Sequence, residues 1–174
     1  MSKGNFNEII FKEFMKTNNI IKYENSHINT FRRICFRFNY FMKHIPLAYS
    51  IQVKSLYEAV IVEFRILPHI EFIIRNAIHK LGKKWSFTVI CGNTNYQLCK
   101  TICNSISINI NLIKLDYDNM TQQEYSNYLM THQFWDLIYG EKILIYQEDS
   151  LIFKDNILDF IKYDFIGAPF VKDS

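Results

Sequence analysis

Short apolar runs that alternate with helix-like segments are the feature that most constrains the fold of this chain. From residue 56 onward such runs recur at regular intervals, and amphipathic stretches lie between them. The expected strands cover residues 59–64, 87–91, 111–115, 142–146 and 163–166. Strict alternation with short connections favours right-handed crossovers and a mostly parallel sheet with helices on its faces. We therefore predict an α/β fold with three layers and a mostly parallel central sheet.

Helix start and stop signals support this interpretation. Pro68 suits the first turn of a helix that ends at Gly82. Thr121, with Glu124 three residues later, forms a capping-box pattern. The first three expected helices cover residues 6–22, 29–43 and 68–81. A fourth passes through Leu98 and Ile102, and a fifth begins at Thr121 and continues as a helical stretch to Gly140. A short helix is expected at 157–161.

The segment 1–50 differs from the rest, because residues 31–44 combine arginines with aromatic side chains. We interpret it as helices packed on the main domain, with the stems of Arg and Lys covering apolar surface. A second interpretation is a basic amphipathic surface that binds an anionic membrane or RNA. A boundary near Pro46 and Ser50 then leaves residues 56–174 as the α/β domain.

Composition excludes several classes of protein. A chain of 174 residues that is 49% hydrophobic can bury a sizeable core and is not intrinsically disordered. A net charge of +3 argues against a dedicated nucleic-acid binder. The four cysteines have no C-x-x-C spacing, so we expect reduced thiols and a cytoplasmic setting. No window reaches the roughly 18 apolar residues that a membrane span requires.

Parallel sheets bind ligands beyond the carboxyl ends of their strands, which directs attention to the residues that follow each run. Glu63 and Arg65 end the first strand, and a guanidinium fork suits phosphate oxygens. A salt bridge between Arg65 and a nearby acid is an equally weighted alternative. Asn93 follows the second strand and serves either as a ligand contact or as a helix cap.

The fourth strand delivers the strongest signal, because it runs directly into Gln147, Glu148, Asp149 and Ser150. Side chains alternate along an extended chain, so Gln147 and Asp149 should share one face and Glu148 the other. A carboxylate at this place can hold Mg²⁺ or Mn²⁺ through oxygen. A solvated turn after the strand is the alternative.

Several spaced motifs in this order resemble the glycosyltransferase-like domains of an uncharacterised family found in large DNA viruses, bacteria and fungi. The motifs lie at residues 63–69, 72–76, 134–136, 140–142, 146–150 and 159–169. The resemblance implies a GT-A fold that binds a nucleotide-sugar donor, with a divalent metal ion, Mn²⁺ or Mg²⁺. It also implies a viral setting as one option, and then the host cytoplasm or the virion as the location.

The resemblance assigns roles to individual residues as well. Asp149 matches the last acid of the Asp-x-Asp motif and is the implied metal ligand, whereas Gln147 stands where the first Asp usually stands. Glu63, Arg65 and Ser150 become candidate donor contacts together with Gln147. No catalytic residue is identified, because the residues that would supply one lie beyond the matched motifs.

Domains of this family continue past the Gly-Ala-Pro motif at 167–169, so we expect this chain to lack the acceptor half. Either the chain is an excised or naturally shortened fragment, or another polypeptide supplies that half. The open sheet edge and its apolar faces also predict self-association. The alternative function is a non-catalytic remnant that keeps the α/β core as a scaffold or interaction module.

Overall fold

The computed structural model describes residues 12–17 and 27–167. Residues 12–17 are helical, and the rest of the helix expected at 6–22 lies outside the described residues. The elements that follow are α2 (His27–Met42), β1 (Tyr57–Val62), α3 (Ile70–Leu81), β2 (Trp85–Cys91), α4 (Tyr96–Ile106), β3 (Asn111–Lys114), α5 (Gln122–Leu129), α6 (His132–Trp135), β4 (Lys142–Tyr146) and the 3-10 helix η1 (Ile157–Phe160).

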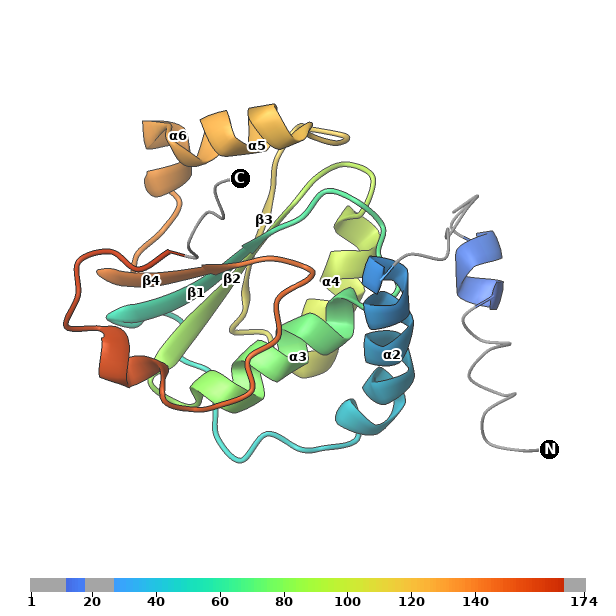
Figure 1. Cartoon of the computed structure of the whole chain (residues 1–174), viewed down its shortest axis with the longest axis horizontal. Helices are drawn as coiled ribbons and strands as arrows, with labels where there is room; N and C mark the ends of the chain where they lie inside the picture. The colour runs from blue at the N-terminus through green and yellow to red at the C-terminus, as the bar shows by residue number, and fades with distance from the viewer. Residues whose placement is uncertain (1–11, 18–26, 168–174) are drawn as a thin grey trace, which may run out of the picture.

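The four strands form one parallel sheet in the order β3-β2-β1-β4. Helices α3 and α4 cover one face, α5 and α6 cover the other, and α2 packs against the outer side of α3 (Figure 1). The predicted three-layer α/β fold is therefore confirmed. Because the chain passes from β3 to the far side of β1 to form β4, the sheet has its switch point between β1 and β4.

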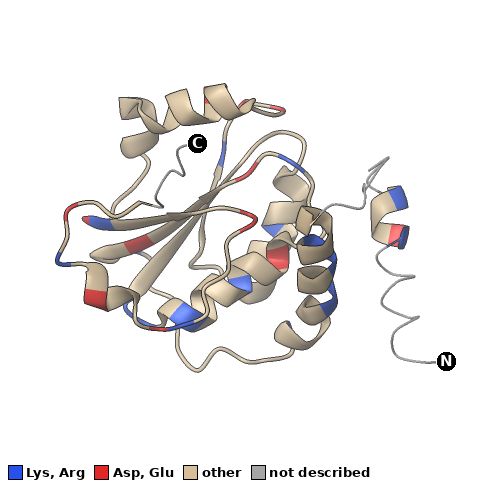
Figure 2. Ribbon diagram, viewed as in Figure 1, with Lys and Arg blue, Asp and Glu red and all other residues tan. Residues whose placement is uncertain are grey.

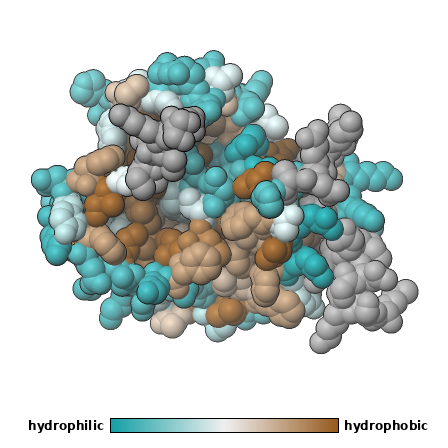
Figure 3. All heavy atoms as spheres, viewed as in Figure 1, coloured by the Kyte–Doolittle hydropathy of each residue, from teal (hydrophilic) through white to brown (hydrophobic). Residues whose placement is uncertain are grey.

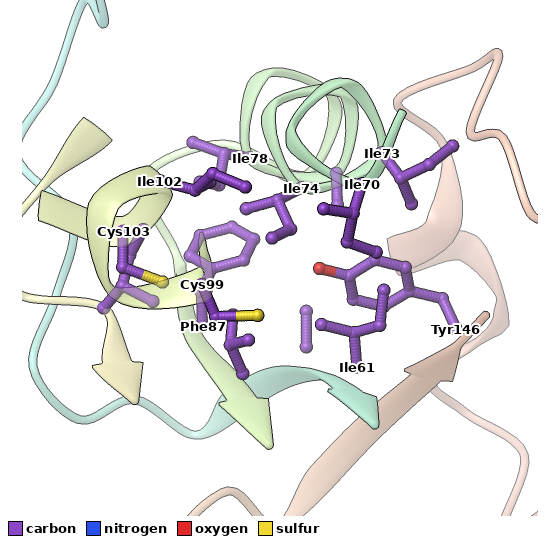
Figure 4. Close-up of a cluster of buried hydrophobic side chains, with 14 of the residues drawn as sticks. Ile61, Ile70, Ile73, Ile74, Ile78, Phe87, Cys99, Ile102, Cys103 and Tyr146 are labelled. Carbon is purple, nitrogen blue, oxygen red and sulfur yellow. The ribbon is translucent and has the colours of Figure 1, made fainter. Parts of the chain in front are cut away.

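Alternation along β1 divides the core into two clusters. Ala59 and Ile61 pack toward α3 and α4, while Val60 and Val62 pack toward α5 and α6. Figure 4 shows the first cluster, in which isoleucines of α3 meet Phe87 of β2 and cysteines of α4. All four cysteines are buried, and none forms a disulfide in the structure. A strand buried on both faces explains why β1 reads as a continuous apolar run.

Local signals in the sequence account for two helix ends. The capping box of α5 is present as predicted, since the Thr121 side chain accepts from the Glu124 amide and Glu124 accepts from the Thr121 amide. Helix α3 ends at Gly82, whose φ of 77° lies in the left-handed region that favours glycine.

The helical stretch expected to reach Gly140 ends earlier, because α6 stops at Trp135. The backbone instead approaches Glu58, a buried acid near the start of β1. Its Oε2 accepts hydrogen bonds of 2.7 Å from the amides of Tyr139 and Gly140. A Cβ at Gly140 would lie 2.6 Å from the Glu58 Cβ, so this contact requires glycine.

The strand predicted at 163–166 is wrong. These residues have no strand conformation, and Phe165 and Ile166 are 87% and 57% exposed. A strand needs a paired neighbour, and among the described strands β4 pairs only with β1. The other strand boundaries shift by at most two residues, and β4 coincides with the predicted 142–146.

Helix α2 turns Cys35 and Asn39 inward and leaves Phe38 and Phe41 more than half exposed. The interpretation of segment 31–44 as a surface for lipid or RNA stays a prediction. No helix among the described residues is long and apolar enough to cross a bilayer.

Candidate functional site

A cavity of about 380 Å³ lies at the switch point of the sheet, beyond the carboxyl ends of β1 and β4. Its lining comes from residues 62–65 after β1, 119–122 and Tyr125 of the β3–α5 connection and α5, and 147–149 after β4. In Figure 2 an acidic stretch in the loop after β4 lies beside the acidic and basic residues that follow β1. This is the location that the topology of a parallel sheet predicts for a ligand.

At the end of β1, Glu63 and Arg65 form a salt bridge that has two guanidinium donors and one backbone donor. The Glu63 carboxylate accepts from the Arg65 amide at 2.8 Å, from Nε at 2.8 Å and from Nη2 at 2.7 Å. The hydrogen bond to Glu63 raises the pKa of Arg65, which keeps the guanidinium charged. Glu63 is buried, whereas 48% of the Arg65 side chain is exposed at the cavity. The salt bridge and a role at the ligand are thus compatible.

At the end of β4, residues 147–150 form a tight turn. The Ser150 amide donates to the Gln147 carbonyl at 3.0 Å, and the Gln147 amide donates to the Ser150 hydroxyl at 3.2 Å. Gln147 and Asp149 are exposed at the cavity, and Glu148 between them is buried. Ser150 does not line the cavity, so its visible role is to close the turn.

Glu148 is the centre of a buried ion-pair network that sequence reasoning missed. Its Oε2 accepts from Arg32 Nε at 3.1 Å and lies 2.8 Å from His69 Nε2. Arg32 Nη2 pairs with Oε1, which also lies 3.4 Å from Arg65 Nη2. Burial raises the pKa of Glu148, but the hydrogen bonds from His69 and Arg32 outweigh it and lower the pKa to about 2. The carboxylate is therefore ionised at neutral pH.

His69 has a defined hydrogen position in this network. Its Nε2 faces two oxygen acceptors, the Glu148 carboxylate and the Glu148 carbonyl at 2.9 Å, so Nε2 carries the hydrogen. The ring is fully buried, and Nδ1 has no partner among the described residues. His69 thus holds both the side chain and the backbone of the residue at the centre of the 147–150 turn.

Asn95 is a second residue that sequence reasoning missed. Its side-chain nitrogen donates to the carbonyls of Glu63 at 2.7 Å and Arg65 at 3.2 Å, and its oxygen accepts from the Gly92 amide at 2.9 Å. It therefore ties the loop after β1 to the loop after β2. The predicted Asn93 is exposed, donates to Asp116 Oδ1 at 2.9 Å and does not line the cavity.

Tyr125 of α5 lines the opposite wall of the cavity. Its hydroxyl is buried, and burial raises its pKa, although an interaction with the Gln147 side chain partly opposes the rise. A neutral phenol in the wall of a cavity can offer a hydrogen bond to a bound ligand.

The donor set for a metal ion is sparse. Among the described residues no group of three or more His, Cys, Asp or Glu side chains converges. Asp149 offers one exposed carboxylate and Gln147 an amide oxygen, while Glu148 is occupied by Arg32 and His69. This set fits Mg²⁺ or Mn²⁺ only where substrate phosphates and water complete the coordination, as they do at many nucleotide sites.

Comparison with known proteins adds one finding. Residues 107–174 match the model of a family described as "Protein of unknown function (DUF5672)". The match runs from β3 through β4 and includes the 147–150 turn. No curated protein and no solved structure matches the chain.

Proposed function

We propose that this chain binds a nucleotide-sugar donor in the cavity between β1 and β4. The observation that carries the proposal is the meeting of a charged Arg65 with the exposed Gln147 and Asp149 at the switch point of a parallel sheet. A guanidinium and an exposed carboxylate suit a diphosphate and the hydroxyls of a ribose. The resemblance to glycosyltransferase-like domains supports the same class of ligand.

Each residue then has a distinct role in binding. Arg65 contacts the diphosphate, and Gln147 and Asp149 contact the ribose or a divalent ion bound to the phosphates. Glu63 orients the guanidinium of Arg65 because both oxygens of its carboxylate accept hydrogen bonds from that group. Asn93 and Ser150, which the sequence predicted as donor contacts, do not line the cavity, and the proposal gives them no contact with the donor.

A divalent metal ion, Mn²⁺ or Mg²⁺, belongs to the proposal as a partner of the donor. When bound it would offset the charge of the diphosphate leaving group. Asp149 is its protein ligand, with Gln147 beside it. Because one carboxylate binds such an ion weakly, we expect metal and nucleotide to bind together.

Sugar transfer needs a second reactant held in line with the donor. We assign no catalytic residue and propose that the acceptor site is completed by a further polypeptide segment. Donor binding is therefore the primary readout for this chain, and transfer is the secondary one.

The experiment is a thermal-shift panel of UDP-, GDP- and dTDP-sugars with and without Mn²⁺ on the wild type, Asp149→Ala and Asp155→Ala. Asp155 is an exposed acid that does not line the cavity, so it is the matched control. A ligand at about 100 times its Kd adds roughly 2.7 kcal/mol to the stability of the native state. We expect a shift with one nucleotide in the wild type and the control, and none in Asp149→Ala. No shift with any nucleotide would refute the proposal.

A second candidate function is an interaction module that keeps the α/β core. A groove of about 820 Å³ beside β4 favours it, because Ile143, Leu144 and Ile145 line it together with apolar residues of the 152–166 segment. Hydrophobic surface gathers over this region in Figure 3. A partner-dependent gain of stability that Asp149→Ala leaves unchanged would favour this candidate.

A further inference from the structure

Helix α2 reaches the candidate site through the side chain of Arg32. This residue lies 116 positions before Glu148 in the chain, yet its Nε and Nη2 atoms engage both oxygens of the Glu148 carboxylate. The contact is largely withdrawn from water, since 16% of the Arg32 side chain and 8% of the Glu148 side chain are exposed. The guanidinium of Arg32 is therefore largely buried, whereas the sequence predicted that arginine stems cover apolar surface and leave their charged ends in water.

A second residue of α2 supports the same contact. The ring of Phe31 packs edge-on against His69, with ring centroids 6.2 Å apart. His69 in turn holds the carboxylate and the carbonyl of Glu148. Two adjacent residues of α2 thus hold Glu148 in place. Arg32 contacts it directly, and Phe31 acts through His69.

Glu148 is the point at which this contact acts on the cavity. It lies between Gln147 and Asp149, which are the exposed polar residues of the turn. Its carboxylate is held by Arg32 and His69, and its backbone carbonyl is held by His69. These contacts restrain the backbone of the turn that carries Gln147 and Asp149.

We infer that Arg32 is a positioning residue of the proposed donor site, which holds Glu148 so that the 147–150 turn presents Gln147 and Asp149 to the ligand. The inference rests on the proposed function for the identity of the ligand. It makes α2 a part of the site, although α2 lies outside the α/β domain in sequence. It also distinguishes the roles of the two acids, with Asp149 facing the ligand and Glu148 facing the protein.

Arg32→Gln removes the charge, and Arg32→Lys keeps the charge but loses the fork. Arg37→Gln is the matched control, because Arg37 lies on the exposed side of the same helix. Breaking one side of a buried ion pair can unfold a protein, so the double variant Arg32→Gln with Glu148→Gln is included as a neutral pair.

The first readout is amide hydrogen exchange, which needs no ligand. In Arg32→Gln we expect the amides of Gln147 and Ser150 to exchange at least tenfold faster, while amides within β4 keep their rates. A general loss of stability would speed both sets alike, and that result would overturn the inference. Arg32→Lys should give an intermediate rate, and Arg37→Gln the wild-type rate. In the double variant Arg32→Gln with Glu148→Gln, the amides of Gln147 and Ser150 should exchange as fast as in Arg32→Gln, because the contact is still missing.

The second readout is the Kd for the nucleotide-sugar that shifts the wild type, measured with Mn²⁺ at pH 5 to 8. We expect at least tenfold weaker binding in Arg32→Gln and partial rescue in Arg32→Lys. Wild-type affinity in Arg32→Gln would overturn the inference. If no nucleotide binds the wild type while the turn amides respond to Arg32→Gln, the proposed function fails, and Arg32 is left as a residue that holds the turn without a donor site.

Discussion

Replacement of Glu148 by Gln tests the ion-pair network directly. The pKa of this carboxyl falls from its ordinary 4.5 to about 2 in the folded protein. Each tenfold change in a proton-binding constant corresponds to about 1.36 kcal/mol, so the ionised carboxylate contributes about 3 kcal/mol to stability at pH 7. We therefore expect Glu148→Gln to lose about 3 kcal/mol at pH 7, which for a chain of this size lowers the Tm by about 6 to 12 °C.

The sign of the pH dependence follows from the lowered pKa. A group whose pKa is lower in the folded state stabilises above its unfolded value and loses that contribution as the pH falls through the folded value. The window for Glu148 is therefore pH 5 to 2. At pH 3 the difference between wild type and Glu148→Gln should shrink to about 1 kcal/mol.

Urea unfolding of the wild type and Glu148→Gln at pH 7, 5, 4 and 3 measures the loss in free energy of unfolding and its change with pH. Glu141→Gln is the control, because Glu141 is an exposed acid at the other end of β4. We expect it to stay within about 0.5 kcal/mol of the wild type at each pH. A loss in Glu148→Gln that is under 1 kcal/mol at pH 7, or that is the same at pH 7 and pH 3, would refute the reasoning.

Three further predictions concern packing and assembly. Gly140→Ala should lose about 1 to 3 kcal/mol in urea unfolding, because the new Cβ would lie 2.6 Å from Glu58; wild-type stability would contradict this contact. Asn95→Ala should lower the free energy of unfolding by about 1 to 3 kcal/mol, because it leaves the Glu63 carbonyl without this donor. It should also speed hydrogen exchange at the Gly92 amide, which loses its acceptor, and an unchanged Gly92 rate would contradict this prediction. The apolar groove beside β4 should cause concentration-dependent self-association in static light scattering, and a monomer at all concentrations would reject that expectation.

Features set by local sequence could be predicted well. The β4 boundaries and the capping box of α5 follow from a short apolar run and from Thr121 with Glu124, and both are present. The place of the cavity follows from strand order alone, because parallel strands present their carboxyl ends at one edge. The alternation expected at 147–149 is seen as exposed, buried and exposed side chains.

Features set by distant contacts could not be predicted in the same way. Nothing near Arg32 in the sequence indicates a partner 116 residues away, and an arginine among aromatic residues usually extends to solvent. The run at 163–166 has a strand-like composition, but a strand also needs an unpaired neighbour at the correct distance. The burial of His69 depends on α2 above it, which its own neighbours do not reveal.

The separation between Arg32 and Glu148 also sets an order of events during synthesis. A ribosome adds about 5 to 20 residues per second, so the 116 residues between them take about 6 to 23 s. Throughout that interval Arg32, in a segment of α2 that carries no acidic residue, has no Glu148 carboxylate to pair with. The ion pair between α2 and the 147–150 turn can therefore form only after all four strands of the described sheet have been synthesised.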